Sequence, residues 1–215
     1  MLKQDFVVRF AGEGGQGMVT SAEAIAQAAA QVGYNVQTFT TFPSQILGGP
    51  TWTQARISVV PVLSSGDDLD VLVAFNREAY EVHASEVREG GVVIYDSAIF
   101  EVEREGPSLG MRFEELGKST GNPRAGNMVI LGALAQFVEW PENYLADFVK
   151  TRFTRGRADD ETIISQNIHG LALGRAEAAR SAFSLGELAA PQKPEGKQIL
   201  VKGNDAFSLG ALAAG

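Results

Sequence analysis

The sequence predicts a three-layer α/β domain with a mostly parallel central sheet. Short apolar runs typical of strands alternate with segments of helical spacing over most of the chain. The run at 70–75 is almost continuously apolar, as in strands that are covered on both faces of a sheet. A glycine-rich turn joins the first strand-like run to the first helical segment, which is the arrangement of Rossmann-like domains. With 215 residues and 45% hydrophobic content, the chain can bury a substantial core.

Local patterns predict the elements of the first half. The alanine-rich segment that follows the glycine turn has helical spacing, and Gly33 is expected to end it. Asn76 is expected to cap a short helix after the buried strand. The predicted strands are 6–11, 34–42, 51–60 and 70–75, and the predicted helices are 18–32 and 77–85.

The second half has a weaker pattern. Residues 89–91 are expected to turn the chain before a strand at 92–95, because two adjacent glycines punctuate the sequence there. Residues 96–123 are expected to hold one small strand and a loop. Apolar spacing and start signals predict helices at 127–137, at 141–153 and from Asp159 or Asp160 to about 184.

Composition divides the chain into three parts. Residues 1–188 carry the α/β pattern and are expected to form one domain. Residues 189–197 contain alanine, proline, lysine and glycine in the proportions of a linker. Residues 198–215 resemble the start of a further strand-and-helix unit, which stops before it buries a core of its own. We therefore expect that the chain was cut from something longer.

Charge and cysteine content exclude several classes of protein. A net charge of −8 argues against sequence-independent binding to nucleic acid or to an anionic membrane. The chain has neither a bilayer-length apolar run nor the apolar core of a signal peptide, so a cytoplasmic location is expected. Without cysteine, it holds no disulfide, no thiolate nucleophile and no cysteine-ligated iron–sulfur cluster. His83 and His169 lack metal-site spacing, so no metal ligand and no catalytic residue is assigned.

The glycine turn is the strongest local signal of a binding site. Gly12, Gly14 and Gly17 fit the pattern G-x-G-x-x-G, and the turn leads directly into a helix. Backbone N–H groups of such a turn converge on one point, where the helix dipole adds partial positive charge that suits phosphate or another anion. Gln16 lies among the glycines, either as a hydrogen-bonding amide of the site or as a polar residue facing solvent.

Other interpretations of the turn stay open. A dinucleotide site needs a carboxylate at the end of the second strand, and 37–42 contains no Asp or Glu. A phosphate-binding Walker loop needs Gly-Lys-Ser/Thr, where this chain has Gln16-Gly17-Met18. The glycines are also explained if they only let the helix pack tightly on the strand.

Three further segments have functional and structural explanations. The loop at 41–52 carries apolar residues between prolines and glycines, and forms a pocket wall, a subunit contact or a cover for its own domain. The aspartates at 67–70 are expected in a solvated turn rather than in acid–base catalysis. The arginines at 152–157 are expected on the surface of a helix end rather than in a phosphate site.

Taken together, the motifs resemble the gamma domain of 2-oxoacid:ferredoxin oxidoreductases, of the 2-oxoglutarate or pyruvate type. The likeness rests on the glycine turn, on the Phe-Pro-Ser-x-Ile-x-Gly-Gly-Pro loop, on Ala-Arg-Ile-Ser at 55–58 and on the segment that opens with Asn127-Met128. It covers about 7–180. The segment 203–215 is similar to the opening of the family's alpha subunit, so the chain resembles the gamma part of a fused gamma–alpha subunit.

The resemblance implies membership of an enzyme complex with alpha and beta subunits or domains. Such a complex decarboxylates a 2-oxoacid on thiamine diphosphate with Mg²⁺, passes electrons through [4Fe–4S] clusters to ferredoxin, and transfers the acyl group to coenzyme A. The fused arrangement favours 2-oxoglutarate as the 2-oxoacid. The isolated chain is expected to be inactive.

The resemblance also directs the site prediction toward coenzyme A. The glycine turn is expected to face the coenzyme A path, with Asn127 alongside. The predicted cofactor-binding residues are Gly12, Gly14, Gly15, Gln16, Gly17, Gly48, Gly49 and Asn127. The alternatives are a purely architectural domain and an independent Rossmann-type nucleotide-binding protein.

Overall fold

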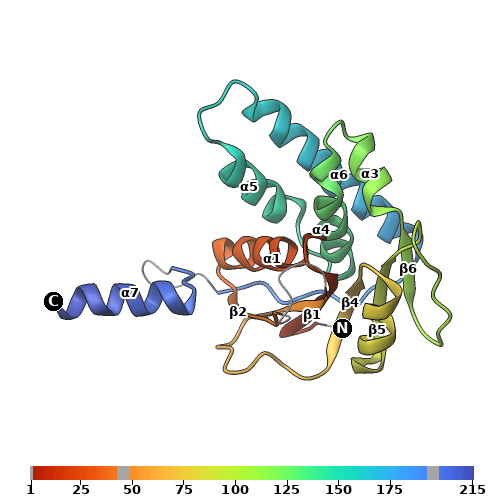
Figure 1. The fold of residues 1–215 in the computed structure, drawn as a ribbon, viewed down its shortest axis with the longest axis horizontal. Helices are drawn as coiled ribbons and strands as arrows, with labels where there is room; N and C mark the ends of the chain where they lie inside the picture. Colours follow the sequence, from red (N-terminus) through yellow and green to blue (C-terminus); the bar gives the residue numbers. More distant parts are fainter. Residues whose placement is uncertain (1, 43–48, 193–198) are drawn as a thin grey trace.

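A six-stranded sheet lies at the centre of the molecule, with helices on both faces (Figure 1). The computed structural model describes residues 2–42, 49–192 and 199–215. The strands are β1 (Asp5–Glu13), β2 (Asn35–Thr40), β3 (Pro50–Ser58), β4 (Leu69–Ala74), β5 (Val87–Asp96) and β6 (Ser108–Met111). The helices are α1 (Met18–Val32), α2 (Arg77–His83), α3 (Phe113–Ser119), α4 (Gly126–Phe137), α5 (Glu142–Phe153), α6 (Asp160–Arg180) and α7 (Gly203–Ala214), with short 3₁₀ turns η1 (Ala84–Glu86) and η2 (Pro123–Ala125).

The strand order β2-β3-β1-β4-β5-β6 confirms a mostly parallel sheet. The pairs β1–β4, β4–β5 and β5–β6 are parallel, whereas β3 runs antiparallel to both of its neighbours. From β1 the chain first moves to one side, through α1 to β2, and later continues on the other side with β4. The point between β1 and β4 is therefore a topological switch point, where open α/β sheets bind ligands at the carboxyl ends of their strands.

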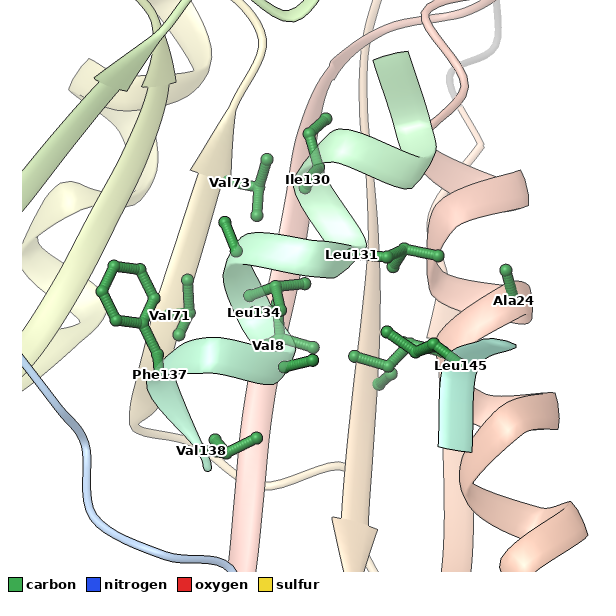
Figure 2. Packing of buried hydrophobic residues seen from close by; sticks show 14 of the residues in the cluster. Val8, Ala24, Val71, Val73, Ile130, Leu131, Leu134, Phe137, Val138 and Leu145 are labelled. Atoms are coloured by element: carbon green, nitrogen blue, oxygen red, sulfur yellow. The ribbon is translucent and has the colours of Figure 1, made fainter. Parts of the chain in front are cut away.

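The main core lies between the sheet and α4. Figure 2 shows Ile130 and Leu134 of α4 directed toward Val8, Val71 and Val73 of the strands, all five fully buried. Helix α4 is apolar around most of its circumference because the sheet covers one side and α6 the other.

Helices α4 and α6 approach each other closely through glycines. A Cβ atom at Gly174 of α6 would overlap the carbonyl oxygen of Val129 and lie 2.7 Å from its carbonyl carbon. A Cβ atom at Gly132 of α4 would lie 2.8 Å from the carbonyl carbon of Leu171. The two backbones are therefore in contact, with no space for a side chain between them.

The opposite face of the sheet has a thinner cover, made by α2 and the segment that follows β5. Leu72, Val93 and Phe100 belong to this second core. The side chain of Asn76 caps α2 as predicted, because its Oδ1 accepts a hydrogen bond from the Ala79 N–H at 2.8 Å. With helices on both faces, the predicted three-layer arrangement is confirmed.

Four local predictions were wrong. Residues 89–91 do not turn the chain but lie inside β5, where the pairing with β4 shifts between Leu69 and Val71. Residues 113–119 form α3, and 199–202 form no strand. Asp70 is not in a solvated turn, since it is buried and pairs with Lys3 and Arg88.

The C-terminal segment of the domain returns to the start of β1. The Leu188 N–H donates to Val138 O at 3.1 Å, and the Ala189 N–H donates to Lys3 O at 2.8 Å. Part of the predicted linker, residues 193–197, lies outside the described residues. Helix α7 is exposed along its whole length, and Lys202 before it pairs with Glu23 of α1 at 2.6 Å. Of the helices that the structure describes, none has both the length and the apolar character to cross a membrane.

Candidate functional site

A cleft of about 760 Å³ opens beside the switch point, between the start of α1 and helices α3, α4, α5 and α6. Its volume lies in the range of small-molecule sites. The lining includes Gly15, Gln16 and Gly17 of the glycine turn, together with Asn127 at the start of α4. The fold therefore brings these four predicted residues together at one cavity.

The glycine turn is closed by its own glutamine. The Glu13 N–H donates to Oε1 of Gln16 at 2.7 Å, and the Gln16 N–H donates to Glu13 O at 3.3 Å. Gly15 and Gly17 have φ angles of 99° and 90°, a left-handed conformation that favours glycine. The amide oxygen of Gln16 thus fixes the shape of the turn.

The glycines of the turn divide into two kinds. A Cβ atom at Gly12 would overlap Oε1 of Gln16 and lie 2.9 Å from Cβ of Phe75, and one at Gly17 would lie 2.6 Å from Nδ2 of Asn127. At Gly14 and Gly15 a Cβ atom would meet nothing within 4 Å. Gly12 and Gly17 therefore permit close packing, whereas the exposed Gly14 and Gly15 leave the backbone accessible.

The start of α1 has the features of an anion site. Its first intrahelical hydrogen bond comes from the Ser21 N–H to Gly17 O at 2.9 Å, so the amides of the first turn have no partner within the helix. Neither a capping side chain nor an acidic residue occupies this turn. Helix α4 directly follows η2, whose start is capped by the side chain of Asn122. The start of α1 therefore presents partial positive charge that no carboxylate of its own first turn compensates.

Polar side chains from other elements complete the cleft. Asn167 of α6 is only 3% exposed, and its Nδ2 donates to Ile163 O at 2.7 Å. Asp96 at the end of β5 accepts a hydrogen bond from the Ala98 N–H at 3.0 Å, and burial raises the pKa of its carboxyl. Arg124 lines the cleft from η2. The sequence analysis missed Asn167, Asp96 and Arg124, because no local motif links them.

The remaining predicted residues lie elsewhere. Gly12 borders a small hollow of about 20 Å³ between β1 and α2, and Gly14 does not line the cleft. Gly49, with a φ angle of 82°, precedes β3 and is also absent from the cleft lining. Gly48 lies outside the described residues. The structure thus concentrates the candidate site on Gly15–Gly17 and Asn127.

The strand order bears on the dinucleotide alternative. In dinucleotide-binding folds, the carboxylate that holds the ribose follows the second strand of the βαβ unit. Here the antiparallel β3 separates β2 from β1, as its pairing with both strands shows. The end of β2 is therefore one strand further from the glycine turn, and 37–42 carries no carboxylate. Both facts argue against a dinucleotide site of this kind.

Comparisons with known proteins agree on one family. The family model described as pyruvate ferredoxin/flavodoxin oxidoreductase matches residues 7–177. The ketoisovalerate oxidoreductase subunit VorA of Methanothermobacter marburgensis is 35% identical over 130 residues, which cover 59% of this chain and 27% of VorA.

Two solved structures have a similar fold. The 2-oxoglutarate:ferredoxin oxidoreductase from Magnetococcus marinus, solved with 2-oxoglutarate, coenzyme A and succinyl-CoA bound, superposes with a TM-score of 0.85 at 34% identity. The match covers 98% of this chain and 37% of that one. The gamma subunit of a keto/oxoacid ferredoxin oxidoreductase from Geobacter sulfurreducens superposes with a TM-score of 0.69, covering 83% of this chain and 99% of that subunit. At 23% identity, the second likeness shows the fold alone. The chain spans less than two fifths of the length of VorA and of the Magnetococcus chain.

Proposed function

Because the chain belongs to the pyruvate ferredoxin/flavodoxin oxidoreductase family, we propose that it supplies the coenzyme A side of a 2-oxoacid:ferredoxin oxidoreductase. The chain corresponds to a gamma subunit of such an enzyme. In the proposed reaction a 2-oxoacid is oxidatively decarboxylated, the acyl group passes to coenzyme A, and ferredoxin is reduced. The partners are alpha and beta subunits or domains, and 2-oxoglutarate is the proposed 2-oxoacid.

The cofactors of the reaction belong to these partners. The chain has no cysteine, and within its described part no three His, Asp or Glu side chains are grouped so as to hold a metal ion. Its residues therefore do not fit a [4Fe–4S] cluster, and we assign none of them to thiamine diphosphate or Mg²⁺. The contribution that we propose for this chain is the binding and orientation of coenzyme A.

The observation that carries the proposal is the open glycine turn, whose Gly15, Gln16 and Gly17 line the cleft of about 760 Å³. Coenzyme A contains a pyrophosphate, and unpaired backbone N–H groups at a helix start are suited to phosphate oxygens. Gly14 and Gly15 leave these groups accessible, and Asn127 beside Gly17 adds a side-chain amide. A purely architectural domain would not need an accessible turn without a carboxylate in its first helical turn.

We also propose that residues 198–215 begin the alpha part of a fused subunit. Helix α7 has apolar side chains without cover, with Phe207 and Leu212 each 80% exposed. The match to the Magnetococcus enzyme includes almost all of this chain but only part of that one. We therefore propose that α7 packs on the alpha part, with 189–197 as the linker.

Replacing Gly15 by valine in the assembled oxidoreductase tests the coenzyme A role. A Cβ atom at Gly15 meets nothing within 4 Å, so the valine strains the backbone but clashes with no neighbour. Its branched group covers the amides of the turn, so calorimetry is expected to show at least tenfold weaker binding of coenzyme A, on the order of 1.4 kcal/mol. The matched control is Gly90→Val in β5, where φ is 74° and a Cβ atom also meets nothing within 4 Å. Both variants carry similar backbone strain, of order 1–3 kcal/mol. Unchanged coenzyme A affinity in the Gly15 variant contradicts the proposal.

A further inference from the structure

Some charged side chains that line the cleft form ion pairs and others do not. The lining contains the carboxylates of Asp96 and Glu114, and Arg124 as its cationic side chain. Glu114 is paired with Lys118 at 2.6 Å. Arg124 is exposed and forms no ion pair with the residues that the structure describes. Asp96 has no ion pair among the described residues either, but burial raises the pKa of its carboxyl. Arg124 is therefore the one cation among the described lining residues, and no described carboxylate pairs with it.

The backbone of Arg124 is anchored near the glycine turn. Its backbone N–H donates to Oδ1 of Asn122 at 3.0 Å, which anchors the start of η2. Asn127 follows three residues later, and its side chain packs against Cα of Gly17. One helical turn spans about 5 Å. The backbone of Arg124 thus lies about one helical turn before Asn127, whose side chain lies beside the glycine turn.

We propose that Arg124 recognises the 3′-phosphate of coenzyme A and makes the site selective for the 3′-phosphorylated form. This inference rests on the function proposed above. Each phosphate of the pyrophosphate has one ester bond and one anhydride bond and carries a single negative charge, which neutral amide donors suit. The 3′-phosphate is a monoester that carries close to two negative charges, and it calls for a full cation. The planar guanidinium group of arginine can donate two parallel hydrogen bonds to one phosphate, whereas the ammonium group of lysine cannot.

The lining of the cleft also has an apolar part. Ile99, which is 60% exposed, and the half-buried Phe153 both line the cavity. Apolar and aromatic side chains of this kind are suited to a nucleobase. In coenzyme A the ribose carries the pyrophosphate at its 5′ oxygen, the 3′-phosphate at its 3′ oxygen and the adenine at C1′, so a cleft with both phosphate donors and an apolar wall suits this end of the ligand.

The test compares coenzyme A with 3′-dephospho-coenzyme A, using calorimetry and steady-state KM values on the assembled oxidoreductase. In Arg124→Ala, we expect coenzyme A binding to weaken by about tenfold or more, as for a lost hydrogen bond between charged groups. Binding of 3′-dephospho-coenzyme A, already weaker in the unmodified enzyme, is expected to stay unchanged. Arg124→Lys is expected to keep part of the preference. Arg152→Ala on α5, an exposed cation outside the cleft lining, is the matched control and should change neither affinity.

The other outcomes overturn the inference. In Arg124→Ala, equal losses of affinity for both ligands would mean that Arg124 does not recognise the 3′-phosphate. Unchanged affinity for both ligands would mean the same. These results leave the proposed function standing if Gly15→Val still weakens coenzyme A binding. If Gly15→Val and Arg124→Ala both bind coenzyme A like the unmodified enzyme, the proposed function fails as well.

Discussion

The Gly174→Val substitution is expected to destabilise the domain by about 3 kcal/mol or more. The new Cβ atom would overlap the carbonyl oxygen of Val129 and lie 2.9 Å from the backbone nitrogen of Ala133. These atoms belong to the α4 backbone and do not rotate away as a side chain does. The two helices must therefore move apart. This disrupts the main core, because many of its buried residues belong to α4.

Urea denaturation followed by circular dichroism measures this loss as a lower midpoint. The matched control is Ala176→Val, on the same helix but exposed to solvent. There only helix propensity changes, by less than about 0.7 kcal/mol. A midpoint for Gly174→Val equal to that of the control would mean that α4 and α6 are not in backbone contact.

The Asp70→Ala substitution is expected to cost about 3 kcal/mol of stability. Asp70 is 3% exposed, and its carboxylate pairs with Lys3 and Arg88 and accepts the Val7 N–H at 2.7 Å. Its removal leaves the Lys3 ammonium, whose side chain is 10% exposed, without its counter-ion. It also leaves a buried N–H of β1 unpaired. The loss of stability is expected near the lower end of the range for buried ion pairs. The Arg88 side chain is 41% exposed, so water can solvate its guanidinium group once the carboxylate is gone.

A graded series separates these effects. Asp70→Asn keeps an oxygen acceptor for the Val7 N–H and loses the charge, so its thermal midpoint should lie between those of the unmodified chain and of Asp70→Ala. Asp68→Ala is the matched control, since Asp68 is exposed in the same segment and should change stability by less than about 0.5 kcal/mol. Equal midpoints for Asp70→Ala and Asp68→Ala would contradict the buried pairing.

The fold was predicted well in the segments where the sequence has strong local signals. The bounds of α1 were predicted because Gly17 and Gly33, both in the left-handed conformation, limit it at each end. Helix α3 was missed because Arg112 provides no side-chain cap and Gly117 interrupts its short pattern. Gly90 was interpreted as a turn, since the sequence does not distinguish a turn from an irregularity within a strand. Asp70 looked solvated because its partners lie far away in the sequence.

The candidate site was predictable only in part. The glycine turn is a continuous motif, and the family resemblance that it supports is confirmed by the match over residues 7–177. Asn127 was connected to the turn through that resemblance, and the structure places its side chain against Gly17. Arg124 and Asn167 come from η2 and α6, and only the packing of α6 on α4 brings them to one cavity. In a single sequence, no spacing between two such distant residues indicates that they share a cavity.

The bond between Gln16 and the Glu13 N–H has a thermodynamic consequence. A flexible loop must be ordered when a ligand arrives, and the entropy of that ordering is subtracted from the affinity. Here the hydrogen bond of Gln16 supports the conformation of the turn, so the phosphate of the proposed ligand would find its donors in place. In Gln16→Ala the turn would have to be ordered when the ligand binds. The binding entropy would then be less favourable and the affinity lower, while the enthalpy of each contact would stay similar.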